Sequence, residues 1–345
     1  MNLEDKNLLE LLDLYRNLGI DKQIDSDKFY LYSIITHSTA IEGSTVTEIE
    51  NQLLFDEGIS APGRTIIEQM MNLDLKAAYE YGYSFAKSHK DYSVESLKYL
   101  ASKVMNRTGE EYTTAIGNFS TAKGDLRLVN VTAGFGGRSY MNYTKVPSKL
   151  NDFCKELNYR RKNIIPKNVM DIYKLSFWAH YELVTIHPWS DGNGRTSRLI
   201  MNMIQREFNV LPMKVLKEDK AKYIEALVES REKENIDVFI DTMLEMHIRN
   251  IRAEIREFVE SQKESPESRY FTGDKSAIKS KIGDKKQAII NYFNQNKCAK
   301  ASEIANFIKL SPSRTRDYLA ELVKEGYLRT EGANKNRKYR LATED

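Results

Sequence analysis

The stretch from His187 to Arg198 is the part of the sequence whose residue types and spacing could do chemistry. It holds one histidine, one carboxylate, two glycines and two arginines three residues apart. Pro188 predicts that the preceding helix ends near Ile186, because proline disfavours helix in the residue before it. A new helix then begins near Gly194, and backbone N–H groups at a glycine-rich helix start converge on anions. The sequence therefore predicts an anion site at a corner between two helices.

The side chains of this corner favour phosphoryl chemistry. Arg195 and Arg198 can bring two guanidinium groups to one side of the helix. Asp191 is out of place in a pure anion site, but a Mg²⁺ ion bridging its carboxylate to phosphate oxygens explains it. His187 has an ordinary pKa of about 6.5, which suits a group that takes a proton from a hydroxyl. A dinucleotide fingerprint, a P-loop and an HExxH zinc site are excluded, because their third glycine, lysine and second histidine are missing.

Residues 187–198 resemble the signature of Fic-domain proteins, HxFx(D/E)GNGRxxR, with Trp189 in place of the usual phenylalanine. The resemblance extends from about Ser38 to His247. It implies transfer of AMP from ATP to a Ser, Thr or Tyr hydroxyl of a target protein, with release of pyrophosphate. It also implies that His187 is the general base and that Asp191 holds Mg²⁺.

The same resemblance implies a set of nucleotide-binding residues. Two glycines and an asparagine cradle the phosphates, two arginines hold the β- and γ-phosphates, and a tyrosine lies near the adenine. Glycine at 194 favours AMP transfer, since relatives that transfer the γ-phosphate carry lysine there. Arg231 stands where the family commonly has an asparagine that contacts adenine. The implied residues are Gly192, Asn193, Gly194, Arg195, Thr196, Ser197, Arg198, Tyr223 and Gly136.

A second motif, Ser38-Thr-Ala-Ile-Glu42-Gly43, places a serine and a glutamate one helical turn apart. Gly43 is well placed to end that helix, and a carboxylate in the last turn is unfavourable against the helix dipole. The pattern resembles the inhibitory motif [S/T]xxxE[G/N] of Fic proteins. The resemblance implies that Glu42 pairs with Arg198 and occupies the γ-phosphate position.

Most of the remaining sequence predicts the helices that position these motifs. Proline and glycine are scarce, at 7 and 17 residues, and apolar residues recur at helical spacing, so the fold class is mainly α. Thr47 and Glu50 have capping-box spacing. His180 is interpreted as a structural histidine. The predicted helices cover residues 4–18, 27–41, 44–55, 65–87, 93–107, 147–158, 167–185, 195–208, 219–230 and 236–260.

Residues 124–146 differ in character and predict a β-hairpin, the only convincing strand pair in the first 250 residues. Leu126, Leu128 and Val131 alternate before three glycines, and Tyr140 and Tyr143 follow. The resemblance implies that this hairpin is the flap that aligns the target protein by strand addition beside the active site. A hairpin that only caps the core is the alternative.

The C-terminal part of the chain predicts a winged helix-turn-helix. Three helices and two short strands follow a polar linker at 261–284. Residues 285–342 hold 13 Lys and Arg but 5 Asp and Glu, whereas the whole chain carries a net charge of only +3. Arg314 and Arg316 begin the recognition-like helix, which Ser311-Pro312-Ser313 caps. Residues 334–338 form a basic wing tip suited to phosphates. DNA binding and a protein-interaction module both remain open.

Composition limits the class of protein. Hydrophobic residues make up 41% and charged residues 29%, which is typical of a globular protein, and no apolar run is long enough for a membrane span. Cys154 and Cys298 lie far apart, which excludes a disulfide framework and a zinc ribbon. A cytoplasmic location is the expectation, since the N-terminus lacks the apolar core of a signal peptide.

The sequence divides into four predicted parts: an N-terminal helical region with the inhibitory helix (1–90), a Fic core (91–260), the linker (261–284) and the winged helix (285–345). ATP is the expected co-substrate and Mg²⁺ the expected cofactor. Two alternative functions remain: a DNA-binding transcriptional regulator that senses nucleotide, and transfer of another nucleoside monophosphate. The target, the removal of AMP and the oligomeric state, a homodimer included, are left open.

Overall fold

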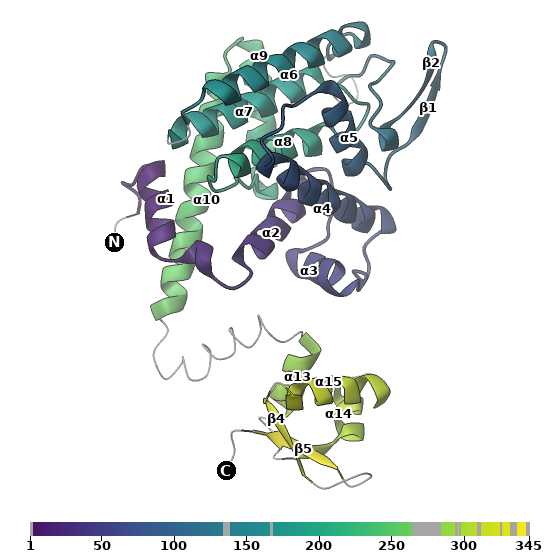
Figure 1. The fold of residues 1–345 in the computed structure, drawn as a ribbon, viewed down its shortest axis with the longest axis vertical. Helices are drawn as coiled ribbons and strands as arrows, with labels where there is room; N and C mark the ends of the chain where they lie inside the picture. Colours follow the sequence, from purple (N-terminus) through teal and green to yellow (C-terminus); the bar gives the residue numbers. More distant parts are fainter. Residues whose placement is uncertain are drawn as a thin grey trace. The chain divides into compact units, whose positions relative to one another are not determined.

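The computed structural model describes residues 3–133, 139–165, 168–263, 284–293, 296, 298–308, 312–324, 326–331 and 337–342. The chain forms two compact units, residues 1–258 and 259–345. The first is built almost entirely of α-helices and the second combines helices with a small sheet (Figure 1). The predicted mainly α fold class is confirmed.

The helices of the first unit follow the predicted positions closely. They are α1 (Leu8–Asn17), α2 (Ser26–Ile41), α3 (Glu48–Glu57), α4 (Ile66–Lys87), α5 (Val94–Val104), α6 (Val146–Asn163), α7 (Val169–Ile186), α8 (Asn193–Glu207), α9 (Lys220–Glu232) and α10 (Asp237–Lys263). Short 3-10 turns lie at Ile20–Lys22 (η1), Thr121–Lys123 (η2), Tyr143–Lys145 (η3) and Lys217–Asp219 (η4).

Helix α8 lies at the centre of this unit and contacts α7, α4, α5 and α2 (Figure 1). Its apolar side chains Leu199, Ile200, Met203 and Ile204 are all fully buried. Each such side chain contributes about 1.5–3 kcal/mol by leaving water. The polar side chains of the first turn of α8 are buried as well. Buried polar side chains need hydrogen-bond partners, which a bound ligand can supply. The start of α8 is therefore where a ligand-binding site is expected.

Reciprocal side-chain caps begin several helices. Thr47 accepts from the Glu50 backbone N–H, and the Glu50 carboxylate accepts from the Thr47 N–H at 2.8 Å. The capping box predicted at these two residues is confirmed. Asn7, Thr65 and Ser93 cap α1, α4 and α5 in the same way.

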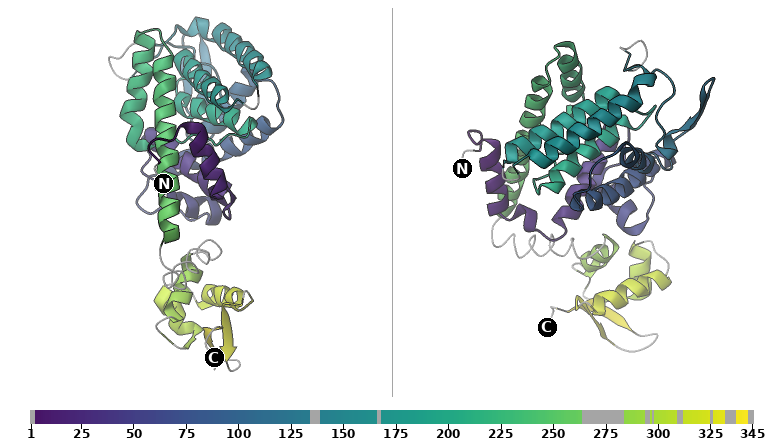
Figure 2. Two further views of the ribbon diagram at one scale, coloured as in Figure 1. Left: turned by 90° about the vertical axis from the view of Figure 1, so that its left-hand side faces the viewer. Right: turned by 45° about the horizontal axis from the view of Figure 1, so that its top comes forward.

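Helix α10 is the longest of the described helices and runs along one side of the first unit (Figure 2). Arg252 of α10 donates to the carbonyls of Glu4 and Lys6 at 2.6 and 2.9 Å, which ties the start of the chain to this helix. None of the helices that the structure describes is both long enough and apolar enough to span a bilayer.

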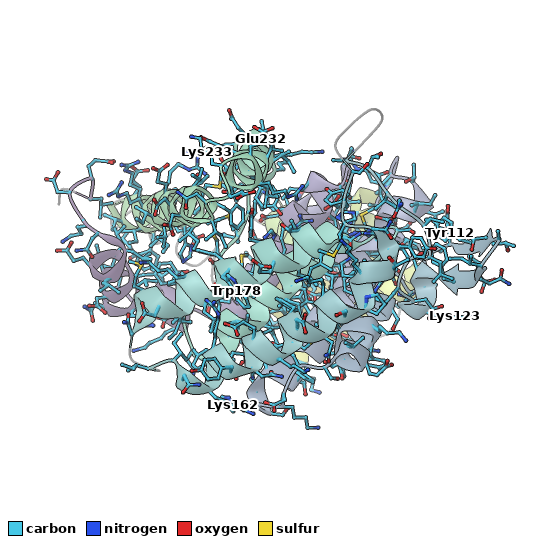
Figure 3. All side chains as sticks on the ribbon, turned by 90° about the horizontal axis from the view of Figure 1, so that it is seen from above. Tyr112, Lys123, Lys162, Trp178, Glu232 and Lys233 are labelled. Carbon is cyan, nitrogen blue, oxygen red and sulfur yellow. The ribbon has the colours of Figure 1, made fainter. Side chains whose placement is uncertain are left out.

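The expectation that 124–146 holds the only strand pair in the first 250 residues was wrong. A regular pair lies earlier, where β1 (Glu111–Thr114) and β2 (Gly117–Ser120) pair antiparallel around a two-residue turn. The hairpin projects from the unit, and Tyr112 and Lys123 lie at the same outer edge (Figure 3). Within 124–146 the described residues form only an isolated bridge between Thr132 and Ser139. The chain does double back there, but residues 134–138 lie outside the described part.

The second unit has the order of elements expected of a winged helix. Helices α13 (Asp284–Phe293), α14 (Ala301–Ile308) and α15 (Pro312–Lys324) pack around an apolar core that includes Ile289, Ile304 and Leu319. Strands β3 (Ala299–Lys300), β5 (Lys338–Leu341) and β4 (Leu328–Glu331) form one antiparallel sheet in that order. Residues 334–336 of the predicted wing tip and residues 264–283 of the predicted linker lie outside the described residues.

Candidate functional site

A loop of six residues, 187–192, joins α7 to α8 and turns the chain sharply. His187 ends α7 in the left-handed region with φ 52°, and its N–H donates to Leu183 O at 3.0 Å. Gly192 begins α8 with φ 81°, a conformation that favours glycine. Helix α7 ends at Ile186, as Pro188 predicts.

Two side chains hold this loop in place. Trp189 is 1% exposed, and its indole N–H donates to Gly124 O at 3.1 Å. The Asn193 amide donates to Trp189 O at 2.8 Å and accepts from the Trp189 N–H at 3.1 Å. In this arrangement the Asn193 side chain closes the loop on itself. Its role in a phosphate cradle remains a prediction, and its bonds show that it shapes the 187–192 loop.

The loop presents His187 in the form that a base requires. Its Nδ1 lies 3.3 Å from Val184 O, so the proton resides on Nδ1 and Nε2 is the nitrogen that can accept another. The ring stacks on Tyr140 with centroids 3.7 Å apart. Burial lowers the pKa of His187 to about 4, helped by the positive charges of Arg127 and Arg231. The imidazole is therefore neutral at neutral pH.

The first turn of α8 holds several buried polar atoms that have no hydrogen-bond partner among the described residues. They are Nε and Nη1 of Arg195, Oγ1 of Thr196 and Oγ of Ser197. An unpaired buried donor costs about 1–3 kcal/mol, and native structures seldom retain several together. The helix N-terminus adds partial positive charge at the same place. Such a set of donors fits a polyanionic ligand.

Asp191 lies at the open side of this turn, with 60% of its side-chain surface exposed. Its carboxylate lies 3.3 Å from Nη2 of Arg195 and also accepts from the Gly192 N–H. The described residues contain no group of three or more His, Cys, Asp or Glu that could hold a metal alone. Mg²⁺ typically takes one or two carboxylates plus substrate phosphates and water, so a single exposed carboxylate beside a phosphate cradle fits that ion.

The second sequence motif reaches the same place from α2. Arg198 donates from Nη2 to Glu42 Oε1 at 2.6 Å, from Nε to Ser38 Oγ at 2.8 Å and from Nη2 to Ser38 O at 2.9 Å. Burial raises the pKa of Glu42, but the positive charges of Arg198 and Arg195 lower it by more. The net shift of the Glu42 pKa is therefore downward. The predicted pairing of Glu42 with Arg198 is present.

Gly194 explains how the Glu42 carboxylate can approach the start of α8. A β-carbon on residue 194 would lie 2.5 Å from Glu42 Oε1 and 3.1 Å from Nη1 of Arg198. Any other residue would displace the carboxylate. Gly43, which follows Glu42 with φ 106°, turns the chain away from the site.

Tyr223 of α9 lies beneath the arginines and is 1% exposed. Its hydroxyl lies 2.8 Å from Nε2 of His180 and contacts Arg198. His180 is fully buried, and burial lowers its pKa to about 3. This agrees with the interpretation of His180 as structural. The adenine contact predicted for Tyr223 remains a prediction, and Gly136 lies outside the described residues.

One residue of the site was missed by sequence reasoning. Arg127 is 1% exposed and donates to three main-chain carbonyls, those of His187 at 2.8 Å, Val129 at 2.7 Å and Met141. Its own N–H donates to Pro188 O at 3.0 Å. It thereby joins the 187–192 loop to the 124–146 segment. The only sequence signal was an arginine between Leu126 and Leu128 in a largely apolar run.

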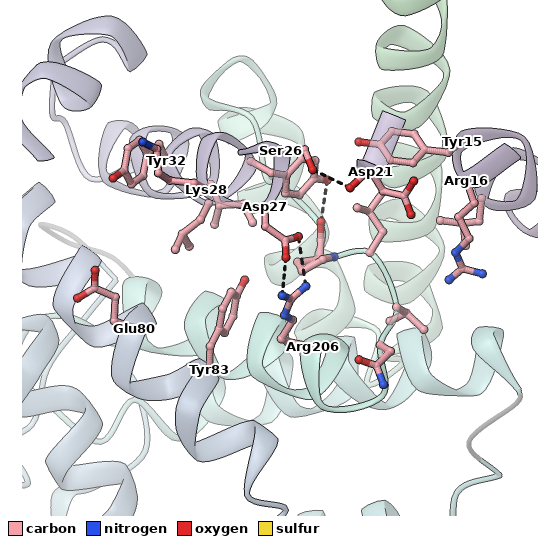
Figure 4. A pocket seen from close by; sticks show the side chains of 18 residues that line it. Tyr15, Arg16, Asp21, Ser26, Asp27, Lys28, Tyr32, Glu80, Tyr83 and Arg206 are labelled. Atoms are coloured by element: carbon pink, nitrogen blue, oxygen red, sulfur yellow. Dashed lines mark hydrogen bonds and ion pairs between the residues drawn. The ribbon is translucent and has the colours of Figure 1, made fainter. Parts of the chain in front are cut away.

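A cavity of about 610 Å³ lies at the opposite ends of α2 and α8 from Glu42 and Arg198 (Figure 4). Tyr15, Tyr83 and Arg206 line it, and Arg206 pairs with Asp27 across it at 2.7 Å. Sequence reasoning gave no indication of it. None of the predicted site residues lines this cavity.

Comparison with known proteins shows which families two parts of the chain resemble. Residues 91–205 match the Fic/DOC family, and residues 284–329 match a winged helix-turn-helix DNA-binding family. The match to the Fic/DOC family thus precedes the match to the winged helix-turn-helix family, which is the order that the sequence predicts. The Trp189 variant of the signature lies within the matched range.

Relatives support the same class. The chain is 26% identical over 204 residues to the protein adenylyltransferase fic-1 of Caenorhabditis briggsae, covering 58% of this chain and 36% of that protein. It is 28% identical over 196 residues to the protein adenylyltransferase Fic of Nematostella vectensis, covering 56% and 42%. The chain therefore spans about two fifths of the length of these relatives.

Solved structures share the fold. A Fic-domain signalling protein of Bacteroides thetaiotaomicron has a TM-score of 0.61 at 18% identity, covering 73% of this chain and 97% of that one. A Fic family protein of Desulfovibrio desulfuricans has a TM-score of 0.55 at 18% identity and covers 98% of this chain and 96% of that one. The second likeness extends over both units of the chain.

Proposed function

We propose that this protein is an adenylyltransferase that transfers AMP from ATP to a Ser, Thr or Tyr hydroxyl of a target protein and releases pyrophosphate. The observation that carries the proposal is the juxtaposition of a neutral His187, with Nε2 free, and a helix start with several unpaired buried donors. Relatives named protein adenylyltransferase support the reaction type.

In the proposed reaction, Nε2 of His187 takes the proton of the target hydroxyl as its oxygen attacks the α-phosphorus of ATP. A bond forms between that oxygen and the α-phosphorus. The bond from the α-phosphorus to the oxygen bridging to the β-phosphate breaks, and its electrons leave with pyrophosphate. Positioning and charge neutralisation supply most of the catalysis in such transfers.

The donors at the start of α8 hold the departing phosphates in this proposal. Arg195 contributes Nε and Nη1, which have no described partner, and Thr196 and Ser197 contribute hydroxyls. Arg198 contributes its guanidinium once Glu42 withdraws. Asp191 would hold Mg²⁺. When bound, the ion neutralises charge on the phosphates.

The proposal includes autoinhibition by Glu42. Its carboxylate lies at the start of α8, bonded to Arg198 at 2.6 Å, where the proposal puts the γ-phosphate. A γ-phosphate at that position would meet a negative charge instead of a free guanidinium. A coupling of about 1–3 kcal/mol, or roughly 5–150-fold, is typical of such competition.

The direct test is self-modification with ATP labelled at the α-phosphate. Glu42→Gly should label about 5–150-fold faster than the unmodified chain, and adding His187→Ala should abolish the labelling. His89→Ala is the matched control, because His89 is exposed and pairs with Glu207 outside the site. Equal, low labelling in the unmodified chain and Glu42→Gly would contradict the inhibitory role.

The same experiment separates the alternatives. Mass spectrometry of Glu42→Gly incubated with each of the four nucleoside triphosphates and Mg²⁺ identifies the transferred group and the acceptor residue. Transfer of UMP or GMP would replace the adenylyl assignment. Binding of ATP without transfer by any variant would favour the nucleotide-sensing DNA-binding regulator.

We also propose that the target segment aligns along residues 124–146. Ser139 and Thr132 bridge there, and Tyr143 N–H donates to Asn130 Oδ1 at 3.0 Å, so the chain doubles back beside His187. An extended peptide could pair with such a segment through main-chain hydrogen bonds.

A further inference from the structure

Tyr140, which follows the glycines of the 124–146 segment, stacks on His187, the proposed general base. The centroids of the Tyr140 and His187 rings lie 3.7 Å apart and the ring planes differ by 17°. The Arg231 guanidinium lies over the same tyrosine ring, 5.1 Å from its centroid. Tyr140 therefore contacts a cation and the imidazole at once, through two different kinds of aromatic contact.

The imidazole needs such support. Its one hydrogen bond in the described structure, from Nδ1 to Val184 O, is long at 3.3 Å. The side-chain torsion that turns a histidine ring has a broad energy profile, so one long hydrogen bond leaves the ring free to rock. A second contact on the ring face restricts that motion without covering Nε2, which lies in the ring plane.

The main chain holds the two rings in register. Tyr140 N–H donates to Val131 O at 3.0 Å, which fixes the tyrosine on its own segment. Arg127 donates to Met141 O, next to Tyr140, and to His187 O at 2.8 Å. The buried Arg127 thus binds the carbonyl of Met141 and the carbonyl of His187 at the same time. The stack of Tyr140 on His187 cannot shift without breaking these bonds.

We propose that Tyr140 is a positioning residue that holds the His187 imidazole, with Arg231 retaining the tyrosine ring over it. This inference rests on the proposed function, since it assigns His187 the role of base. Tyr140 acts through the histidine. The stacked ring sets the direction in which Nε2 faces the acceptor hydroxyl.

The charged groups that face the imidazole are Arg127 and Arg231, which oppose its protonation, and Asp191, which favours it. Burial is the largest influence, and Tyr140 supplies part of that burial by covering one ring face. Removal of the tyrosine ring should therefore bring the His187 pKa closer to its ordinary value, in addition to loosening its orientation.

The test measures transfer kinetics and the His187 titration separately in the full chain carrying Glu42→Gly. Tyr140→Ala should lower kcat about 3- to 10-fold, the loss expected for an aromatic pair, with KM for ATP changed less than about twofold. Its His187 midpoint, followed by NMR of the ring protons, should rise. Tyr140→Phe should preserve both values, and Arg231→Gln should give intermediate values.

Three further measurements make the outcome decisive. Tyr140→Leu keeps apolar bulk without a ring, so it should lower kcat as Tyr140→Ala does but raise the His187 midpoint less than Tyr140→Ala. Tyr159→Ala, in an exposed tyrosine, should leave the His187 midpoint unchanged. A thermal melt of each variant reports folding. An unchanged kcat and midpoint in Tyr140→Ala, or equal losses in Tyr140→Phe and Tyr140→Ala, would overturn the proposal. If no variant transfers nucleotide, the proposed function fails, while the NMR midpoints still test the stack.

Discussion

Burial decides the charge of two histidines that lie seven residues apart at the end of α7. It lowers the pKa of His180 to about 3 and that of His187 to about 4, so both rings are neutral at neutral pH. Their surroundings then separate their roles. Nε2 of His180 is engaged by the Tyr223 hydroxyl at 2.8 Å, whereas Nε2 of His187 has no hydrogen-bond partner among the described residues and can accept a proton.

The low pKa of His187 predicts a flat pH profile on the acidic side. Transfer by Glu42→Gly should fall by less than about twofold between pH 8 and pH 5.5, because a base with a pKa of about 4 is still neutral there. A base with the ordinary pKa of about 6.5 would lose roughly tenfold over the same range. Initial rates across this range decide between the two, and a tenfold loss would contradict the buried base.

The same shift predicts how folding stability depends on pH. The folded chain keeps His187 neutral while the unfolded chain binds a proton below about pH 6.5, so protonation favours unfolding as the pH falls from about 6.5 to 4. In urea unfolding, the unmodified chain should therefore lose more free energy of unfolding than His187→Gln as the pH falls through this window. A constant difference between the two would contradict the shift.

At the scale of elements, the corner between α7 and α8 depends on a side chain from a distant segment. Arg127 enters from the 124–146 segment and, although fully buried, pairs with carbonyl oxygens. Burial lowers the pKa of its guanidinium, but the three carbonyls satisfy its donors. The corner and the segment therefore behave as one structural element.

Arg127→Met should lower the free energy of unfolding by about 2–4 kcal/mol, because it leaves three carbonyls without their donor. It should also lower the transfer rate, since one carbonyl belongs to His187. Arg127→Lys keeps the charge but cannot reach three acceptors in a fork, so it should recover only part of the stability. Denaturant unfolding measures both variants, and equal stability of Arg127→Met and the unmodified chain would refute this account.

The end of α8 offers a matched pair of ion pairs on adjacent residues. Arg161 and Glu207 pair at 2.5 Å with about 4% of each side chain exposed, whereas Arg206 and Asp27 pair at 2.7 Å with 29% and 77% exposed. Arg161→Met should cost about 3–5 kcal/mol, because the buried Glu207 carboxylate would keep only the exposed His89 beside it. Arg206→Met should cost at most about 1 kcal/mol. Similar losses in thermal unfolding of the two variants would contradict the difference in burial.

Sequence patterns predicted the helices of this fold well, since their signals are local. Thr47 and Glu50 specify a helix start within four residues, and Pro188 specifies an end. The β1–β2 hairpin was missed because its turn, Ala115-Ile116, lacks the asparagine or glycine typical of two-residue turns. Gly117, just after the turn, has φ 141° and was the only glycine signal there.

Sequence patterns predicted the contacts of the candidate site that involve residues of a recognised motif. They missed the contacts between segments that lie far apart in the sequence. The pairing of Arg198 with Glu42 could be predicted because a resemblance linked the two motifs. The contacts of Arg127 and Tyr140 with His187 could not, because they depend on how the 124–146 segment folds over the loop. No periodicity or spacing in the sequence encodes that approach.

For the whole molecule, the charge of the second unit predicts its behaviour towards nucleic acid. Arg316 of α15 and Arg337 and Lys338 beside the wing are exposed. The full chain should shift random duplex at low salt, and the apparent affinity should fall steeply as salt rises. Arg316→Glu with Lys338→Glu should weaken binding and reduce the salt slope by about 0.9 for each phosphate that the protein no longer neutralises.

Lys162→Glu with Lys233→Glu is the matched control, because it makes the same change in net charge on exposed lysines of the first unit (Figure 3). This variant should bind duplex as the unmodified chain does. If neither the unmodified chain nor this control variant binds duplex at low salt, the second unit is instead a protein-interaction module. If both double variants lose affinity equally, net charge alone accounts for the binding.

The close approach of Glu42 to Gly194 also constrains how this protein can evolve. Because a β-carbon at 194 would lie 2.5 Å from Glu42 Oε1, the two positions are sterically coupled although α2 and α8 are distant in the sequence. A library selected for low self-labelling after Gly194→Ala should accumulate shorter residues at position 42, with aspartate the most conservative. Gly194→Ala removes the space that the Glu42 carboxylate occupies, and Glu42→Asp no longer needs that space. The effects of these two substitutions should therefore be strongly epistatic.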